Sequence, residues 1–400
     1  MNIGVFTIML HSGGTERVIA KLSLMWSSLG HKVHFFTIRK PHDAEFPHEC
    51  VVRDCAPEGG WTVADADRLQ KEHGLDLVVF NGGWNNAWVE PLVCRFSDLK
   101  VRTLAILHHA FNNWAFAGCN GGDFDKDCLL SHLDCLVCVD KMQALWWSRR
   151  HRKVVYMPNP CALESQSVLP IGQSGEKGHK IVWIGRADDD GKRVSLAIEV
   201  FHEVRKRIPD AELTIIGALP KAWKCVEPGI KCVGYVPNTA EFLNAAAVHL
   251  VTTLWEVTVP QVILEAMAYG VPTVAFDLPV FRGVDGMWLG KDVDSVAALT
   301  VDVMSSPDKY NVLDELRKIA DRNKEIEGRW GDLVKAFEAG DLSAYTEKRM
   351  PEYFNLDVYG QLLDEIQRSE AFAVATQLPL VNKARRWKAR WAHLKQMVGL

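Results

Sequence analysis

The chain lacks several features that would place it outside the soluble globular proteins. It has no apolar run long enough to cross a membrane, and its first ten residues lack the basic segment and cleavage site of a signal peptide. Its ten cysteines follow no disulfide-framework spacing, which is typical of a reducing compartment. Repeats of solenoid period and low-complexity tracts are absent as well. These absences predict a cytoplasmic globular protein.

An excess of positive charge is also lacking. The formal net charge of −4 argues against a general nucleic-acid binder, so we expect no nucleic-acid partner. The charge is nevertheless uneven, because residues 381–400 contain six Lys or Arg and no Asp or Glu. The preceding 380 residues contain 40 basic and 50 acidic residues, a net charge of −10. A basic end on an acidic body needs its own explanation.

Length and patterning predict an α/β protein of two doubly wound, Rossmann-like domains. Four hundred residues exceed one ordinary core, and short apolar segments alternate with helical patterns in both halves. We expect domains at 1–163 and 164–335, a helical extension at 336–400, and a hinge and linker over 158–180. The expected strands are Ile3–Leu10, Lys32–Ile38, Leu75–Phe80, Arg102–Leu107, Leu133–Val139, Val154–Met157, Lys180–Ile184, Glu212–Ile216, Val248–Thr252 and Val271–Phe276.

Two strand–helix turns carry residues suited to anions. Gly13 and Gly14 lie between the first strand and a helix, where glycine allows close backbone approach and the helix start offers N–H groups. The same pair also suits a tight connection that binds nothing. In the second half, Arg186 and Lys192 follow a buried strand and are able to converge on a diphosphate. Alternatively they are surface cations that pair with the neighbouring residues 188–190, all Asp.

Two further patterns involve acids and thiols. Glu265 is the one acid in an apolar helix that Pro260 begins and Gly270 ends, so its carboxylate needs hydrogen-bond donors. Sugar hydroxyls and a neighbouring loop are both candidates. Cys135 and Cys138 form a CxxC within an apolar strand, where positions three apart point to opposite faces. We therefore interpret them as buried structural thiols, and we expect no metal site.

An ordered set of motifs resembles retaining family 4 (group 1) glycosyltransferases of the GT-B fold. The resemblance covers roughly residues 1–300, and Phe354–Leu363 is similar to the closing helix of that family. The segments that carry it are Gly13–Val18, Leu29–Val33, Pro158–Pro160, Ile184–Arg186 with Lys192, Leu213–Gly217, Val233–Tyr235 and Leu264–Ala275.

The resemblance implies two Rossmann-like domains that face a cleft, with a C-terminal extension that crosses back to the first. It also implies a role for each matched residue. Arg186 and Lys192 would bind the donor diphosphate and assist its departure, and Glu265 would bind the ribose. The Gly13–Gly14 loop would face the donor, as would either His108 or His109. The implied donor is a UDP- or GDP-sugar, with no permanently bound cofactor and no metal at the diphosphate.

The sequence departs from the family pattern at one carboxylate. The family has two glutamates separated by seven residues, whereas Glu256 and Glu265 are separated by eight and Val257 stands at the family position. Either Glu256 reaches the donor from a shifted loop or the first carboxylate is missing. The implied reaction is sugar transfer with retention to a glycan or lipid-linked acceptor, in cell-surface polysaccharide, lipopolysaccharide or glycolipid synthesis.

The basic C-terminal end fits that acceptor class. Apolar residues recur at helical spacing over 380–400, with the cations around them, as in helices that bind anionic membranes at the inner face. A helix packed on the body is the alternative. Two other functions stay open for the chain. One is a non-catalytic nucleotide-binding scaffold, and the other is an oxidoreductase, although His11–Arg17 offers only a glycine pair.

Overall fold

The computed structural model describes residues 1–8, 10, 13–38, 51–56, 60–82, 88–108, 127–148, 153–161, 178–187, 191–217, 227–236, 238–253, 256 and 258–346. The chain divides into two compact units. The first runs from Met1 to Ala162 and resumes at Asn323, and the second covers Leu163–Arg322. In the part of the chain that the structure describes, no helix has the length and apolar character needed to cross a membrane.

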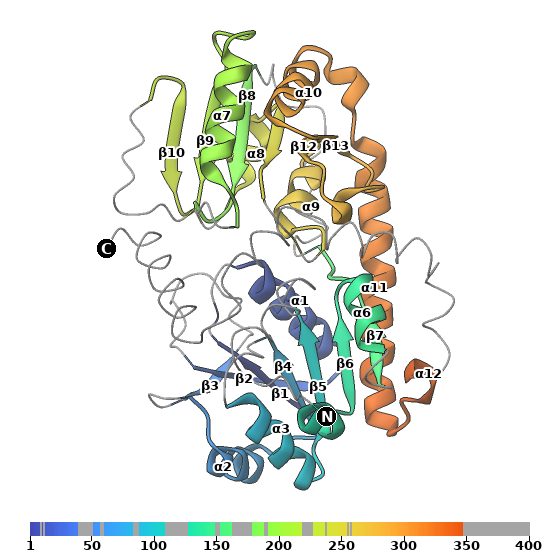
Figure 1. Ribbon diagram of the computed structural model, residues 1–400. Helices are drawn as coiled ribbons and strands as arrows, with labels where there is room; N and C mark the ends of the chain where they lie inside the picture. Colours follow the sequence, from blue (N-terminus) through green and yellow to red (C-terminus); the bar gives the residue numbers. More distant parts are fainter. Residues whose placement is uncertain are drawn as a thin grey trace, which may run out of the picture. The chain divides into compact units, whose positions relative to one another are not determined.

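The first unit is built on a parallel sheet in the order β3-β2-β1-β4-β5-β6-β7 (Figure 1). Its strands are β1 (Asn2–Thr7), β2 (Lys32–Thr37), β3 (Val52–Cys55), β4 (Leu77–Asn81), β5 (Arg102–Leu107), β6 (Cys135–Cys138) and β7 (Val154–Tyr156). Its helices include α1 (Gly14–Ser28), α2 (Val63–His73), α3 (Val89–Asp98), α5 (Asp127–His132), α6 (Lys141–Ser148) and α12 (Ser343–Thr346).

Helices cover both faces of this first sheet. On one face, aromatic side chains of neighbouring strands pack together, with Phe6 of β1 stacked on Phe80 of β4 at 5.4 Å between ring centroids. Apolar residues of α2, α3, α5 and α6 complete that core. On the other face, Trp26 of α1 contacts Trp330, and both are fully buried. Such two-sided burial explains why the strands are continuous apolar runs.

The second unit is a six-stranded parallel sheet in the order β10-β9-β8-β11-β12-β13. Its strands are β8 (Lys180–Ile184), β9 (Glu212–Ile216), β10 (Ile230–Gly234), β11 (Val248–Val251), β12 (Thr273–Phe276) and β13 (Met287–Gly290). The helices α7 (Val194–Arg205) and α10 (Val293–Ser305) pack on one face. The helices α8 (Ala240–Ala245) and α9 (Gln261–Ala268) pack on the other. The short 3-10 helices η2 (Pro279–Phe281) and η3 (Pro307–Tyr310) follow later in the unit.

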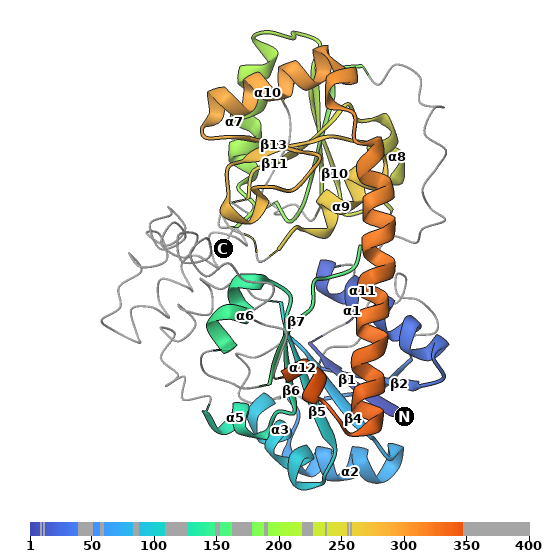
Figure 2. The ribbon, with the colours of Figure 1, turned by 90° about the vertical axis from the view of Figure 1, so that its right-hand side faces the viewer.

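One long helix belongs to both units. The helix α11 (Leu313–Ala339) begins in the second unit and ends in the first, where Asn323 and the residues after it belong (Figure 2). Its first-unit half makes polar contacts with the residues on either side of the Pro158–Asn159–Pro160 segment and with α1. Asn323 accepts a hydrogen bond from the Cys161 amide at 2.8 Å, Arg329 donates to the Tyr156 carbonyl at 2.6 Å, and Glu327 pairs with Lys21 of α1 at 3.1 Å.

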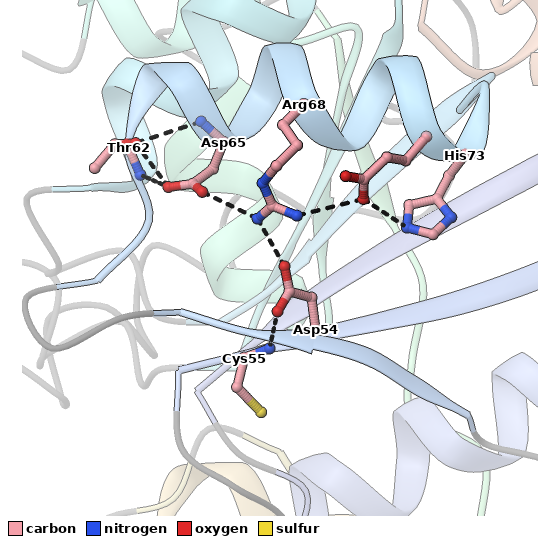
Figure 3. A network of polar contacts seen from close by, with 7 residues as sticks. Asp54, Cys55, Thr62, Asp65, Arg68 and His73 are labelled. Carbon is pink, nitrogen blue, oxygen red and sulfur yellow. Dashed lines mark hydrogen bonds and ion pairs between the residues drawn. The ribbon is translucent and has the colours of Figure 1, made fainter.

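A polar network fastens the edge strand β3 to α2 (Figure 3). The Arg68 guanidinium of α2 contacts Asp54 of β3 at 2.6 Å and Asp65 of its own helix at 3.0 Å. Thr62 and Asp65 form a capping box at the start of α2. Because β3 is short and carries charged side chains, these contacts supply attachment that apolar packing gives elsewhere in the sheet.

The expected α/β architecture with two Rossmann-like domains is confirmed, and every strand predicted from an apolar run is present. Three strands without such a prediction are also present, namely β3, β10 and β13. The helix after β1 ends at Ser28, and the next residue, Leu29, is 43% exposed. Cys232 is disulfide-bonded, a pairing that the cysteine spacing does not predict.

Candidate functional site

The strand order marks one place in the second unit where a ligand is expected. From β8 the chain moves outward to β9 and β10, and then it returns to the other side of β8 with β11. In such open parallel sheets, ligands bind outside the carboxyl ends of the two strands at this switch point. The residues that follow β8 and β11 are therefore the first candidates for a binding site.

The segment after β8 carries Arg186 and Lys192. Arg186 is exposed and Lys192 is half-buried. Gly185 lies close to Lys192, since a Cβ added at Gly185 would be 3.5 Å from the lysine Cγ. The turn ends at Arg193, which has a φ of 52° although it is not glycine. That left-handed conformation is strained for an L-residue, so surrounding contacts must maintain it.

The segment after β11 supplies those contacts. The Thr252 hydroxyl lies 2.9 Å from each of the carbonyl oxygens of Lys192 and Arg193, and Thr253 donates to the Gly191 carbonyl at 3.0 Å. Thr252 also accepts a hydrogen bond from the Trp183 indole of β8 at 3.0 Å. Both threonines are buried. The end of β11 thus holds the backbone on either side of Lys192 in one conformation.

The side chain of Lys192 is held by the same segment. Its ammonium forms an ion pair with the Glu256 carboxylate, and the exposed fractions of the two side chains are 28% and 13%. The ion pair joins residues on either side of the switch point. The hypothesis that Asp188–Asp190 neutralise these cations concerns positions outside the described residues. Among the residues that the structure describes, Lys192 pairs with Glu256.

Glu265 lies on α9, whose other residues are almost all apolar and buried. Its side chain is 1% exposed. Pro260 precedes the helix as its N-cap residue, and Tyr269 and Gly270 close it, as the sequence predicts. A carboxylate at this depth needs hydrogen-bond donors, because burial of an unsatisfied charge is costly. The geometry places one acid on each side of the α9 start, with Glu256 before it and Glu265 within it.

Glycines bring the strand ends of this edge close together. Gly217 follows β9 with a φ of 139°, and its amide donates to the Gly234 carbonyl at 2.8 Å. A Cβ at Gly217 would lie 1.7 Å from the Gly185 carbonyl oxygen, so no other residue fits. The backbone at the ends of β8, β9 and β10 is consequently uncovered by side chains at these positions, which suits close approach of a ligand.

The first unit has an equivalent edge. Its switch point lies between β1 and β4. Gly13 is the N-cap of α1 after β1, and its carbonyl accepts the Arg17 amide at 3.0 Å. Asn81 ends β4 and is 4% exposed. His108 follows β5, and its Nε2 lies 2.9 Å from the Asn81 Oδ1.

Sequence reasoning missed Asn81, Thr252 and Thr253. Each is a polar residue at the carboxyl end of a buried strand, and that position is the signal that identifies them. Several predicted features lie outside the described residues, namely His109, Val257, residues 188–190 and the 347–400 segment with its basic end.

The two cysteines of the CxxC lie within a strand of the first unit. Cys135 and Cys138 of β6 are fully buried, and burial raises the pKa of both thiols well above the ordinary value. Among these residues, no group of three His, Cys, Asp or Glu is arranged to hold a metal ion. The CxxC is thus part of the core.

Comparisons with known proteins relate this edge to sugar-transfer enzymes. Residues 178–306 match the family model described as "Glycosyl transferases group 1". A segment of 138 residues is 28% identical to a phosphatidyl-myo-inositol mannosyltransferase of Mycobacterium leprae, covering 32% of this chain. The chain spans only 37% of the length of that curated relative.

Solved structures resemble the fold over most of the chain. HepE from Anabaena, in complex with UDP and glucose, superposes with a TM-score of 0.67 at 12% identity, covering 84% of this chain and 100% of HepE. WaaG, a glycosyltransferase involved in lipopolysaccharide biosynthesis, superposes with a TM-score of 0.57 at 11% identity, covering 92% of this chain and 99% of WaaG. At this identity the likeness shows the fold, which is that of GT-B glycosyltransferases.

Proposed function

We propose that the protein is a glycosyltransferase that moves a sugar from a nucleoside-diphosphate sugar to a glycan or lipid-linked acceptor. The observation that carries the proposal is the convergence at the switch point of the second unit. There Lys192 after β8 and Glu256 after β11 meet beside a glycine-lined strand edge. The match of residues 178–306 to group 1 glycosyltransferases covers this whole region.

Each site residue has a chemical role in this proposal. Lys192 and Arg186 bind the diphosphate and offset the negative charge that develops as it departs. Glu265 accepts hydrogen bonds from the ribose hydroxyls. In the first unit, His108 and the glycines at the start of α1 bind the donor sugar and phosphate. The Asn81 contact fixes the orientation of the His108 ring.

The proposed chemistry is transfer with retention and without a metal. The acceptor hydroxyl attacks the anomeric carbon from the face that the diphosphate leaves. The bond from that carbon to the diphosphate oxygen breaks, and the departing oxygen takes the proton of the acceptor hydroxyl. The carbon–acceptor bond forms on the same face. Lys192 and Arg186 supply the stabilising charge in place of a divalent ion.

The place of action follows from the acceptor class. Similar proteins act on phosphatidylinositol or in lipopolysaccharide synthesis, to judge by their names. We therefore propose a cytoplasmic enzyme that works at the inner membrane face, with the basic 380–400 segment as its contact to anionic lipid. A non-catalytic nucleotide-binding scaffold is the second candidate, and Val257 at the position of the family glutamate favours it.

An assay of donor turnover separates these two candidates. Purified protein is incubated with UDP-glucose and, separately, with GDP-mannose, each with a lipid extract as acceptor, and release of UDP or GDP is followed. A transferase releases the nucleoside diphosphate from one donor. Lys192→Ala should lower the rate at least about a hundredfold, in line with the loss of one charge that stabilises a leaving group. Binding without any release would favour the scaffold.

A further inference from the structure

The partner of Lys192 controls how strongly the turn after β8 attracts an anion. The Lys192 ammonium is paired with the Glu256 carboxylate, and both side chains are largely withdrawn from water. A diphosphate that binds at Lys192 must take the place of that carboxylate or lie beside its negative charge. Pairing and like-charge repulsion therefore both oppose the ligand.

We propose that Glu256 is an internal competitor for the diphosphate site, which weakens nucleoside-diphosphate binding and speeds its release. The inference rests on the proposed function, because it assumes that Lys192 binds a diphosphate. It gives Glu256 a role that differs from contact with the donor sugar. The Glu256 carboxylate pairs with the Lys192 ammonium when no diphosphate is bound, and the ion pair breaks when a diphosphate binds.

The fold keeps the Glu256 carboxylate close to the Lys192 ammonium. Glu256 follows the same strand end whose Thr252 and Thr253 hold the backbone around Lys192. Carboxylate and ammonium thus stay on one edge whichever partner the ammonium has. Local reformation of the pair needs only side-chain rotation and no rearrangement of the backbone. Such an exchange favours departure of the product after transfer.

Binding and dissociation of UDP and of GDP test the competitor role. The full chain is compared with Glu256→Gln, which keeps the side-chain size and removes the charge. We expect the nucleotide that binds to bind Glu256→Gln roughly tenfold more tightly, mostly through slower dissociation, as loss of about one opposing charge interaction implies. Titration calorimetry gives the affinity and stopped-flow displacement gives the dissociation rate.

Two control variants keep the result interpretable. Glu212→Gln removes the same charge from the same unit at the amino end of β9 and should leave the affinity within about twofold of wild type. Glu256→Asp keeps the charge and should keep the weaker binding, which also provides a test if Glu256→Gln does not fold. Unchanged or weaker binding by Glu256→Gln would overturn the competitor role while the proposed function stands. Failure of wild type to bind either nucleotide would overturn both.

Discussion

His249 illustrates how a single buried residue makes the second unit sensitive to acid. It lies within β11 at 0% exposure, with Nδ1 3.2 Å from the Thr273 hydroxyl, and Nε2 has no hydrogen-bond partner among the described residues. Burial lowers the pKa of this imidazole from 6.5 to about 3. The native protein consequently keeps His249 neutral at neutral and mildly acidic pH.

The lowered pKa predicts a loss of stability below neutral pH. Above pH 6.5 neither state binds the proton, whereas between pH 6.5 and about 3 only the unfolded chain does. The free energy of unfolding should thus fall by about 2 kcal/mol between pH 7 and pH 5 on account of this group alone. Urea unfolding at both pH values measures the fall in wild type and in His249→Gln. An equal fall in the two proteins would contradict the assignment.

The backbone at position 217 is a second example at the residue scale, because it accepts only glycine. Its φ of 139° and the 1.7 Å approach of a Cβ to the Gly185 carbonyl oxygen exclude any side chain. We expect Gly217→Ala to destabilise the second unit by more than about 3 kcal/mol. Gly328→Ala is the matched control, because Gly328 lies within α11 and, apart from its chain neighbours and the backbone of its own helix, no described atom comes within 4 Å of an added Cβ. That variant should be neutral or stabilised by up to about 1 kcal/mol in thermal unfolding.

At the scale of elements, hydrogen bonds join the end of β11 to the turn before α7. The Thr252 hydroxyl contacts two carbonyls of the turn and accepts the Trp183 indole, so one buried group satisfies three others. These bonds maintain the left-handed Arg193 and with it the direction of Lys192. Thr252 is therefore a positioning residue that acts through the backbone around Lys192.

Removal of that hydroxyl should affect stability and binding together. Thr252→Val leaves buried polar groups unsatisfied, at an expected cost of about 1–3 kcal/mol of unfolding free energy. It should also weaken the binding of the nucleoside diphosphate, as titration calorimetry would show. Thr300→Val is the control, since the buried Thr300 hydroxyl donates to the Val296 carbonyl of its own helix, α10. It should lose stability yet bind the nucleotide as wild type does. Equal nucleotide affinity in Thr252→Val and Thr300→Val would contradict the positioning role of Thr252.

At the scale of the whole molecule, α11 runs through both units, and its second half stabilises the first unit. Trp330 of its second half is fully buried against Trp26 of α1. We expect Trp330→Ala to cost about 3–5 kcal/mol, because it leaves a large cavity in the first unit. Hydrogen exchange should accelerate in β1 and β4 and stay unchanged in β8 and β9. Acceleration confined to the second unit would contradict this assignment.

The sequence predicted those parts of the fold that local patterns determine. Strands buried on both faces, such as β5 and β8, were found at their observed bounds because parallel strands are continuous apolar runs. The edge strand β3 contains Arg53 and Asp54 and has no such run, so local patterning could not reveal it. The family resemblance supplied the order of the site motifs.

Partners in the site could not be predicted, because they depend on tertiary contacts. Lys192 and Glu256 are 64 positions apart in the chain, and Asn81 and His108 are 27 apart. Nothing in either local sequence indicates that these side chains meet. The local sequence likewise does not determine the depth of Glu265, whose side chain is 1% exposed on α9.

The central claim is that the switch point of the second unit binds a nucleoside diphosphate. A thermal-shift screen of wild type against UDP, GDP, ADP, CMP and NAD tests it most directly, since a bound ligand raises the melting temperature by mass action. We predict a rise with one nucleoside diphosphate, which Lys192→Ala and Glu265→Ala abolish while they remain folded. A rise with NAD alone, or with no nucleotide at all, would contradict the claim.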